Sequence, residues 1–131
     1  ALYNDMMRDP ELFERIVSTV AGIDPNLRLM ILSTPERERY ETIARRYGIG
    51  LIHELFADRH YTPEGKLVPR SEPDAVIHDP EHVLQRIRHY RERGHLLSRE
   101  GTPLKLRGDS LCVHGDNPEA IALVEALRRV L

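Results

Sequence analysis

The sequence lacks the cysteine pairs, the long apolar runs and the excess of positive charge that are typical of extracellular, membrane and nucleic-acid-binding proteins. It contains one cysteine, Cys112, so no disulfide can form within the chain. Lysine and arginine number 19 against 21 aspartates and glutamates, which gives a formal net charge of -2. That near balance provides no overall attraction to phosphate backbones or anionic lipid. We therefore expect a cytoplasmic protein with neither nucleic acid nor membrane as a partner.

Long apolar runs are also missing. Charged side chains interrupt the first twenty residues, so no signal-peptide core fits there, and no later run approaches the length of a membrane span. With 131 residues, 40% hydrophobic and 31% charged, the composition is typical of a single globular domain over residues 1–131. The chain opens without an initiator Met and enters a helical pattern almost at once. We interpret it as a fragment of a longer protein.

What the sequence does have is a repeated helix-start signal, in which a capping side chain is followed by Pro and Glu. It occurs at residues 9–11, 34–36, 79–81 and 117–119, and an apolar stripe at helical spacing follows each time. Short apolar runs at 29–32, 51–56 and 111–113 predict strands, with a small hairpin around Gly101 and a long loop over 57–79. This alternation predicts an α/β fold with parallel strands and crossover helices. Part of a barrel and a small open sheet both fit.

In parallel α/β folds, ligands bind beyond the carboxyl ends of the strands. Two segments occupy that place, residues 54–61 and residues 110–118. Strand alternation puts Ser110, Cys112 and His114 on one face, away from the helices. His114 with Asp116 is a plausible acid/base unit. The alternative is structural, with Asp116 near a helix start and His114 closing the core.

Cationic groups near these segments are candidate anion binders. Arg59 and Arg70 can each bind a carboxylate or phosphate through the guanidinium fork, although Asp58 and Arg59 could instead be a surface ion pair. Cys112, flanked by apolar residues, is better explained as a core residue than as a nucleophile. Residues 65–66 lack the context of a phosphate loop.

The histidines give no strong metal signal. His82, Arg86, His89 and Arg93 fall at helical spacing, and we interpret them as a solvated helix face rather than a nucleic-acid surface. No other histidine pair has ligand spacing. A site that combines His114 with ligands outside this sequence stays open.

Several blocks spread along the chain resemble the LamB/YcsF family, the A subunit of prokaryotic 5-oxoprolinase. They are residues 1–4, Glu54 with 56–61, Gly65 with 67–71, 75–77 with Asp79, and 109–110 with 112–116. Asp74 departs from the pattern, since the family commonly has Gly there. The family's amino-terminal motifs are absent, so the resemblance implies the carboxyl-terminal half of a family member.

The resemblance implies a (β/α) barrel related to glycoside hydrolase/deacetylase folds. It also implies ATP-dependent opening of 5-oxo-L-proline to L-glutamate, with Mg²⁺ accompanying ATP and with B and C subunits as partners. On that basis we expect His114 and Asp116 to be catalytic. We expect Glu54, Asp58, Arg59 and Arg70 to bind substrate, and no metal to be held by the protein. The alternative functions are a metal-dependent deacetylase on a related barrel and a non-catalytic lactam-binding subunit. The protein could also assemble as a homo-oligomer.

Overall fold

The computed structural model describes residues 2–114 and 118–131. The predicted catalytic residue Asp116 lies outside the described residues. The elements, in chain order, are α1 (Leu2–Arg8), α2 (Pro10–Ile23), β1 (Arg28–Leu32), α3 (Arg37–Arg46), β2 (Gly50–Phe56), α4 (Pro80–Arg93), β3 (Leu96–Leu97), β4 (Pro103–Leu104), β5 (Ser110–Cys112) and α5 (Pro118–Val130). In the part that the structure describes, no helix is long and apolar enough to cross a membrane.

The helix-start signals act through side-chain caps. The Asp9 carboxylate accepts from the backbone N–H groups of Glu11 and Leu12, and α2 begins at Pro10. The Asp79 carboxylate caps α4 in the same way. The signal at 34–36 forms a turn first, in which the Thr34 hydroxyl accepts from the Glu36 N–H, and α3 starts at Arg37. The sequence therefore predicted these helix starts to within two residues.

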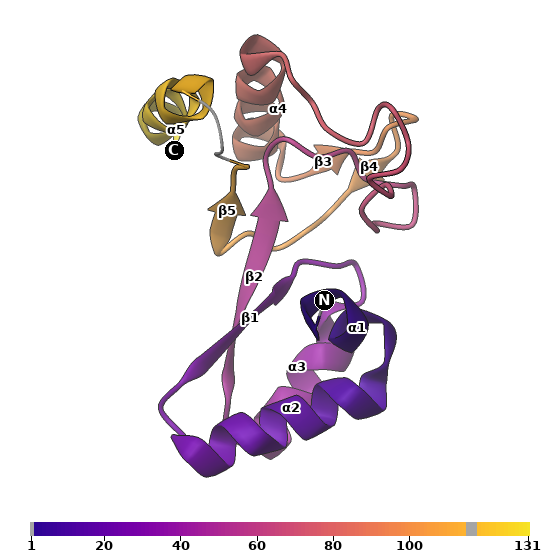
Figure 1. Ribbon diagram of the computed structural model, residues 1–131, viewed down its shortest axis with the longest axis vertical. Coiled ribbons are helices and arrows are strands. Elements are labelled where there is room, and N and C mark those ends of the chain that lie inside the picture. Colours follow the sequence, from indigo (N-terminus) through magenta and orange to yellow (C-terminus); the bar gives the residue numbers. More distant parts are fainter. Residues whose placement is uncertain (1, 115–117) are drawn as a thin grey trace.

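Three parallel strands form the main sheet, in the order β1-β2-β5. Leu29 pairs with Leu51 in one ladder, and Leu55 pairs with Leu111 in the other. Figure 1 shows β2 and β5 side by side, both pointing toward the end of the molecule where α4 and α5 lie. The predicted parallel pairing is confirmed. It brings the segments that follow β2 and β5 to one edge of the sheet.

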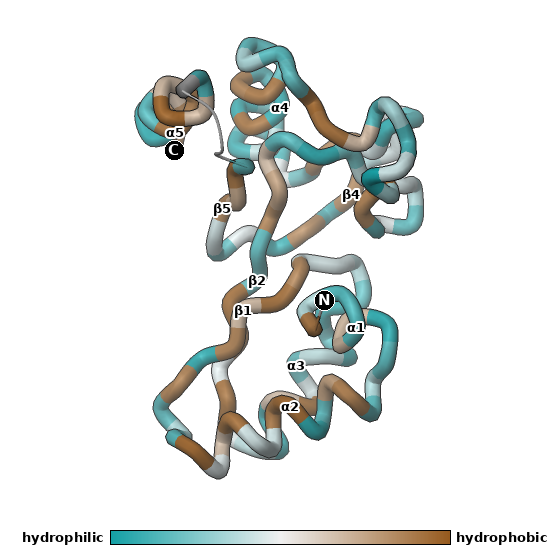
Figure 2. The backbone as a smooth tube through the Cα atoms, viewed as in Figure 1, coloured by the Kyte–Doolittle hydropathy of each residue, from teal (hydrophilic) through white to brown (hydrophobic). Residues whose placement is uncertain are grey.

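The amino-terminal core packs α1, α2 and α3 against β1 and the start of β2. Phe13 and Val17 of α2 are fully buried there, and the Phe13 ring meets Tyr40 of α3 edge to face at 5.0 Å. Figure 2 shows the tube of α2 alternating between hydrophobic and hydrophilic residues, as expected for a helix with one buried face. The whole cluster comprises Met6, Phe13, Val17, Ile31, Tyr40, Ile43, Ala44, Ile49 and Leu51.

The other end of the sheet is closed by the long loop, the hairpin and the last two helices. Leu111 and Val113 pack with residues of α4 and α5, on the helix-covered face as predicted. The loop over 57–79 is more ordered than its length suggests, because Arg59 pairs with Val76 and Tyr61 with Leu67 as antiparallel bridges. Tyr61 is fully buried, and its hydroxyl accepts from the Phe56 N–H at 3.0 Å. The predicted hairpin is present as β3 and β4.

Candidate functional site

Asp58 and His114 meet at the carboxyl ends of β2 and β5. The backbone N–H of His114 donates to Asp58 Oδ2 at 3.0 Å, and His114 Nδ1 lies 3.1 Å from Oδ1 of the same carboxylate. Asp58 is buried, whereas the His114 side chain keeps 31% of its surface exposed. Asp58 therefore holds His114 by both its backbone and its ring. The other ring nitrogen, Nε2, is not used in this pair.

Aromatic and cationic groups flank the pair. The Phe56 ring stacks on the His114 ring with centroids 5.8 Å apart, and the Arg59 guanidinium lies 5.9 Å from the Phe56 centroid. Arg59 Nη2 donates to the Val68 carbonyl at 2.8 Å, but its Nε is buried without a partner among the described residues. Burial lowers the pKa of Arg59, and the positive charge of Arg70 lowers it further.

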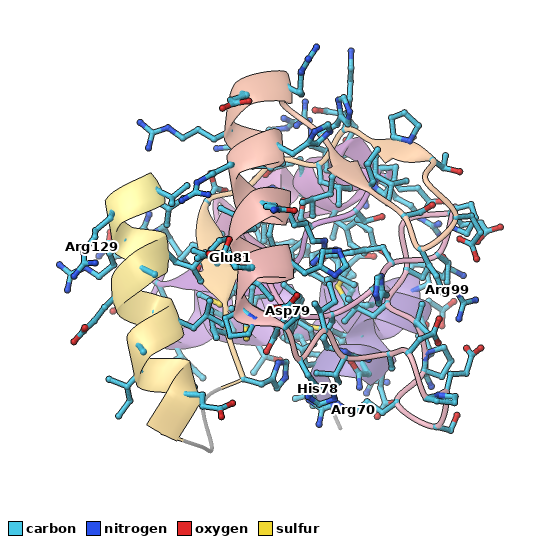
Figure 3. All side chains as sticks on the ribbon, turned by 90° about the horizontal axis from the view of Figure 1, so that it is seen from above. Arg70, His78, Asp79, Glu81, Arg99 and Arg129 are labelled. Atoms are coloured by element: carbon cyan, nitrogen blue, oxygen red, sulfur yellow. The ribbon has the colours of Figure 1, made fainter. Side chains whose placement is uncertain are left out.

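Arg70 is the exposed member of this cationic pair. In Figure 3 it lies beside His78, on the long loop below α4. Its charge acts on Arg59 and on Cys112 of β5. Two arginines whose charges act on each other, one with an unused buried N–H, suit an anionic group.

Glu54 is engaged by a residue that the sequence analysis did not select. The Tyr3 hydroxyl donates to Glu54 Oε1 at 2.9 Å. Burial, and then the Glu54 carboxylate, raise the pKa of Tyr3. Tyr3 belongs to the block at residues 1–4 that carried part of the family resemblance, which is the signal that could have identified it.

Cys112 is a half-buried thiol whose surroundings favour the protonated form. It packs against the apolar cluster that includes Leu55, Phe56 and Tyr61. Burial raises its pKa, and the carboxylates of Glu54 and Asp58 raise it further. The thiolate is the reactive form, so this environment opposes a nucleophilic role, in agreement with the interpretation from sequence.

Arg86 corrects the interpretation of α4. The sequence analysis placed it on a solvated face with His82, His89 and Arg93. In the structure it is buried, and its Nη1 donates to the carbonyls of Phe56 and Ala57 at 3.0 and 2.8 Å. Val83 and Ile87 flank it on the buried stripe of the helix. The positions of Val83 and Ile87, three residues before and one after Arg86, indicated burial from the sequence, whereas the charge of Arg86 suggested exposure.

The described residues contain no group of three or more His, Cys, Asp or Glu side chains placed to hold a metal ion. The geometry instead brings together an oriented histidine, a buried carboxylate and two arginines. This combination can bind an anion and transfer a proton beside it.

Residues 1–131 match the LamB/YcsF family. The chain belongs to this family. Among curated LamB/YcsF relatives, the A subunit of 5-oxoprolinase from Vibrio cholerae serotype O1 (strain ATCC 39541) is 43% identical over 131 residues, covering 100% of this chain and 52% of the relative. The protein of the same name from Chromohalobacter salexigens is 43% identical over 128 residues, covering 98% of this chain and 51% of the relative.

A protein of known structure has the same fold. The lactam utilization protein from Thermus thermophilus superposes with a TM-score of 0.82 at 35% identity, covering 100% of this chain and 51% of that one. The predicted α/β class is confirmed, and the chain forms about half of a barrel. It also spans about half the length of the curated relatives it matches.

Proposed function

We propose that this chain is part of the A subunit of an ATP-dependent 5-oxoprolinase, which opens 5-oxo-L-proline to L-glutamate. The observation that carries the proposal is the Asp58–His114 pair beside Arg59, at the carboxyl ends of two adjacent parallel strands. The names of the relatives give the reaction class: this chain is 43% identical to proteins named as the A subunit of 5-oxoprolinase.

The substrate's charge suits the arginines. 5-Oxo-L-proline carries one carboxylate next to its lactam ring, and we assign Arg59 and Arg70 to an anionic group, either this carboxylate or a phosphate. The buried Nε of Arg59 has no partner among the described residues, so it is a donor that such an acceptor would satisfy. A carboxylate bound at Arg59 would place the lactam near His114. The Arg59 guanidinium lies 5.9 Å from the centroid of the Phe56 ring, and that ring stacks on the His114 ring.

We assign His114 to proton transfer. With the Nδ1 proton donated to Asp58, Nε2 can accept a proton from a water molecule as its oxygen attacks the lactam carbonyl carbon. The same proton can then pass to the lactam nitrogen as the C–N bond breaks, which yields the amine of glutamate. Asp58 then orients His114 instead of contacting the substrate. Asp116 stays a proposed catalytic partner.

When bound, ATP would supply the activation that an unreactive lactam needs, by transferring its terminal phosphoryl group to the carbonyl oxygen. Attack of water and cleavage of the C–N bond would then leave a γ-glutamyl phosphate, and a second water would release the phosphate, so that glutamate, ADP and phosphate are the products. Mg²⁺ would arrive with the nucleotide, because Mg²⁺ in such sites takes much of its coordination from phosphates and water. That is compatible with the described residues, which offer no three-ligand group of their own. We further propose that the site is completed by B and C subunits, and by the barrel half that the longer relatives contain.

The test uses the intact protein that contains this chain, with and without B and C subunits, assayed for glutamate and ADP. His114→Asn keeps a donor near the Nδ1 position but removes the base. We expect glutamate formation to fall by about 10²–10⁴-fold, with the melting temperature nearly unchanged. His95→Asn, a histidine in the turn between α4 and β3, is the matched control.

Two results would contradict the proposal. Wild-type protein that binds 5-oxoproline but forms no glutamate or ADP with its partner subunits would make this a lactam-binding protein. Near-normal turnover in His114→Asn would remove His114 from catalysis and leave it with a structural role beside Asp58.

A further inference from the structure

A pocket of about 400 Å³ lies between α4 and the β3–β4 hairpin. Figure 3 shows Arg99 on this side of α4, away from α5. Its polar lining includes His60 from the long loop, His82, Arg86 and His89 from α4, and Ser98 and Arg99 from the hairpin segment. Arg86 and Ser98 are the buried members of this set. The exposed wall of the pocket is thus largely apolar, with a few polar groups, among them a guanidinium, set into it.

Arg86 forms no ion pair with a carboxylate among the described residues. Its Nη1 is used by the two backbone carbonyls at the end of β2, and its guanidinium lies 5.4 Å from the Tyr61 ring centroid. Its Nη2 is buried with no hydrogen-bond partner in the described part of the chain. Buried cations are normally paired, and a buried N–H without an acceptor is costly. Arg86 therefore places in the wall of the pocket a buried guanidinium that has an N–H without an acceptor among the described residues.

The charge of Arg99, in contrast, is paired with carboxylates. It pairs with Glu72, Asp74 and Glu100 at 3.1 to 3.2 Å, so its charge is already offset. Those three carboxylates do not line the pocket. Arg86 has no such direct ion pair among the described residues, and the carboxylate that acts on its charge is that of Asp58.

Further hydrogen-bonding side chains surround the same space. The His60 and His82 rings meet edge to face with centroids 6.0 Å apart. Burial lowers the pKa of His60, and the charges of Arg86 and His82 lower it further. Asp74 raises this pKa, whereas Arg99 lowers it. The Ser98 oxygen accepts from the Thr102 N–H, which leaves the Ser98 O–H free to donate. A guanidinium, two imidazoles and a hydroxyl approach from three separate segments of the chain.

We propose that this pocket binds a phosphoryl group, either as inorganic phosphate or as the terminal phosphate of a nucleotide. Donors that converge from several directions suit a tetrahedral dianion better than a planar carboxylate, and the guanidinium fork binds phosphate oxygens in pairs. The proposal concerns a different pocket from the Asp58–His114 site. It does not depend on the 5-oxoprolinase reaction.

The test is a titration of the intact protein at constant ionic strength, followed through the imidazole C–H signals of His60 and His82 by nuclear magnetic resonance. Inorganic phosphate, ADP and acetate are the three probes. Saturable shifts with phosphate, and not with acetate, are expected. Shifts with ADP alone identify the nucleotide as the source of the phosphoryl group. Equal shifts with acetate, or none with either phosphate compound, would overturn the proposal.

Variants make the assignment specific. Arg86→Gln should weaken binding by about tenfold or more, as expected for loss of a charge-assisted hydrogen bond. Because this change also disturbs the end of β2, His82→Ala is the second variant: it is exposed, and it should weaken binding without lowering the melting temperature. Arg88→Gln, an exposed arginine on the same helix, is the matched control. Unchanged affinity in both Arg86→Gln and His82→Ala would overturn the assignment.

Discussion

The amino-terminal core and the region where β2 and β5 end differ in the kinds of side chain that they bury. Around Phe13 the buried side chains of the core cluster are apolar apart from the Tyr40 hydroxyl, which donates to the Met7 carbonyl. Around Tyr61 the structure buries Asp58 and Arg86 and leaves two guanidinium N–H groups without partners among the described residues. Apolar burial is favourable by itself, whereas buried charge costs free energy unless it is paired. The first region thus supports the fold, and the second retains costly groups that a ligand can use.

The largest expected effect on stability is in the amino-terminal core. Phe13→Ala removes a fully buried ring that packs against Tyr40, and it should lower the free energy of unfolding by about 3–5 kcal/mol. Ile23→Ala, at the exposed end of the same helix, should change it by less than about 0.5 kcal/mol. Urea unfolding of the intact protein measures both. A loss of activity per folded molecule in Phe13→Ala would contradict the assignment of a purely stabilising role to the amino-terminal core.

A smaller effect on stability, but a larger one on function, is expected at Asp58. Asp58→Asn keeps the size of the side chain but removes the negative charge of the carboxylate, whose two oxygens contact the backbone N–H and Nδ1 of His114. We expect a stability loss of about 1–3 kcal/mol and a fall in glutamate formation of at least about 10²-fold. Asp24→Asn, at the carboxyl end of α2, is the matched control. Activity loss no greater than the loss of folded protein would make Asp58 purely structural.

The smallest effect is expected at Cys112, where only reactivity should change. A raised pKa means less thiolate at any given pH, so the folded protein should react with iodoacetamide at about pH 8 more slowly than a free thiol does. Glu54→Gln removes the largest electrostatic cause of the shift and should speed the reaction, while the melting temperature stays nearly constant. Mass spectrometry of the alkylated peptide gives the rate. A fast reaction in the wild type would show that this region is more open than the structure has it.

Local signals in the sequence predicted the framework well. Asp9 and Asp79 cap helices through bonds to residues two or three positions later, so their roles follow from short sequence patterns. The apolar runs predicted the three strands of the main sheet and their parallel direction. His114 was selected from its place after a strand, which the order of elements already indicated.

The contacts within the site could not be predicted in the same way, because they join distant residues. The Asp58 carboxylate accepts from the backbone N–H of His114, which is 56 residues away, and its expected contact with substrate stays a prediction. The Tyr3–Glu54 bond spans 51 residues. Arg86 shows a different failure: its position on the apolar stripe of α4 indicated burial, but the carbonyls that accept its hydrogen bonds lie at the end of β2. Only the packing of α4 on the end of β2 reveals them.

The separation of Asp58 from His114 also has a consequence for the order of assembly. The amino-terminal core uses residues between 6 and 51, and much of it forms between neighbouring elements. Joining β5 to β2 must instead close a stretch of about fifty residues, which costs chain entropy before the ladder and the Asp58–His114 contacts offset it. We therefore expect a refolding chain to form its apolar support before Asp58 and His114 come together.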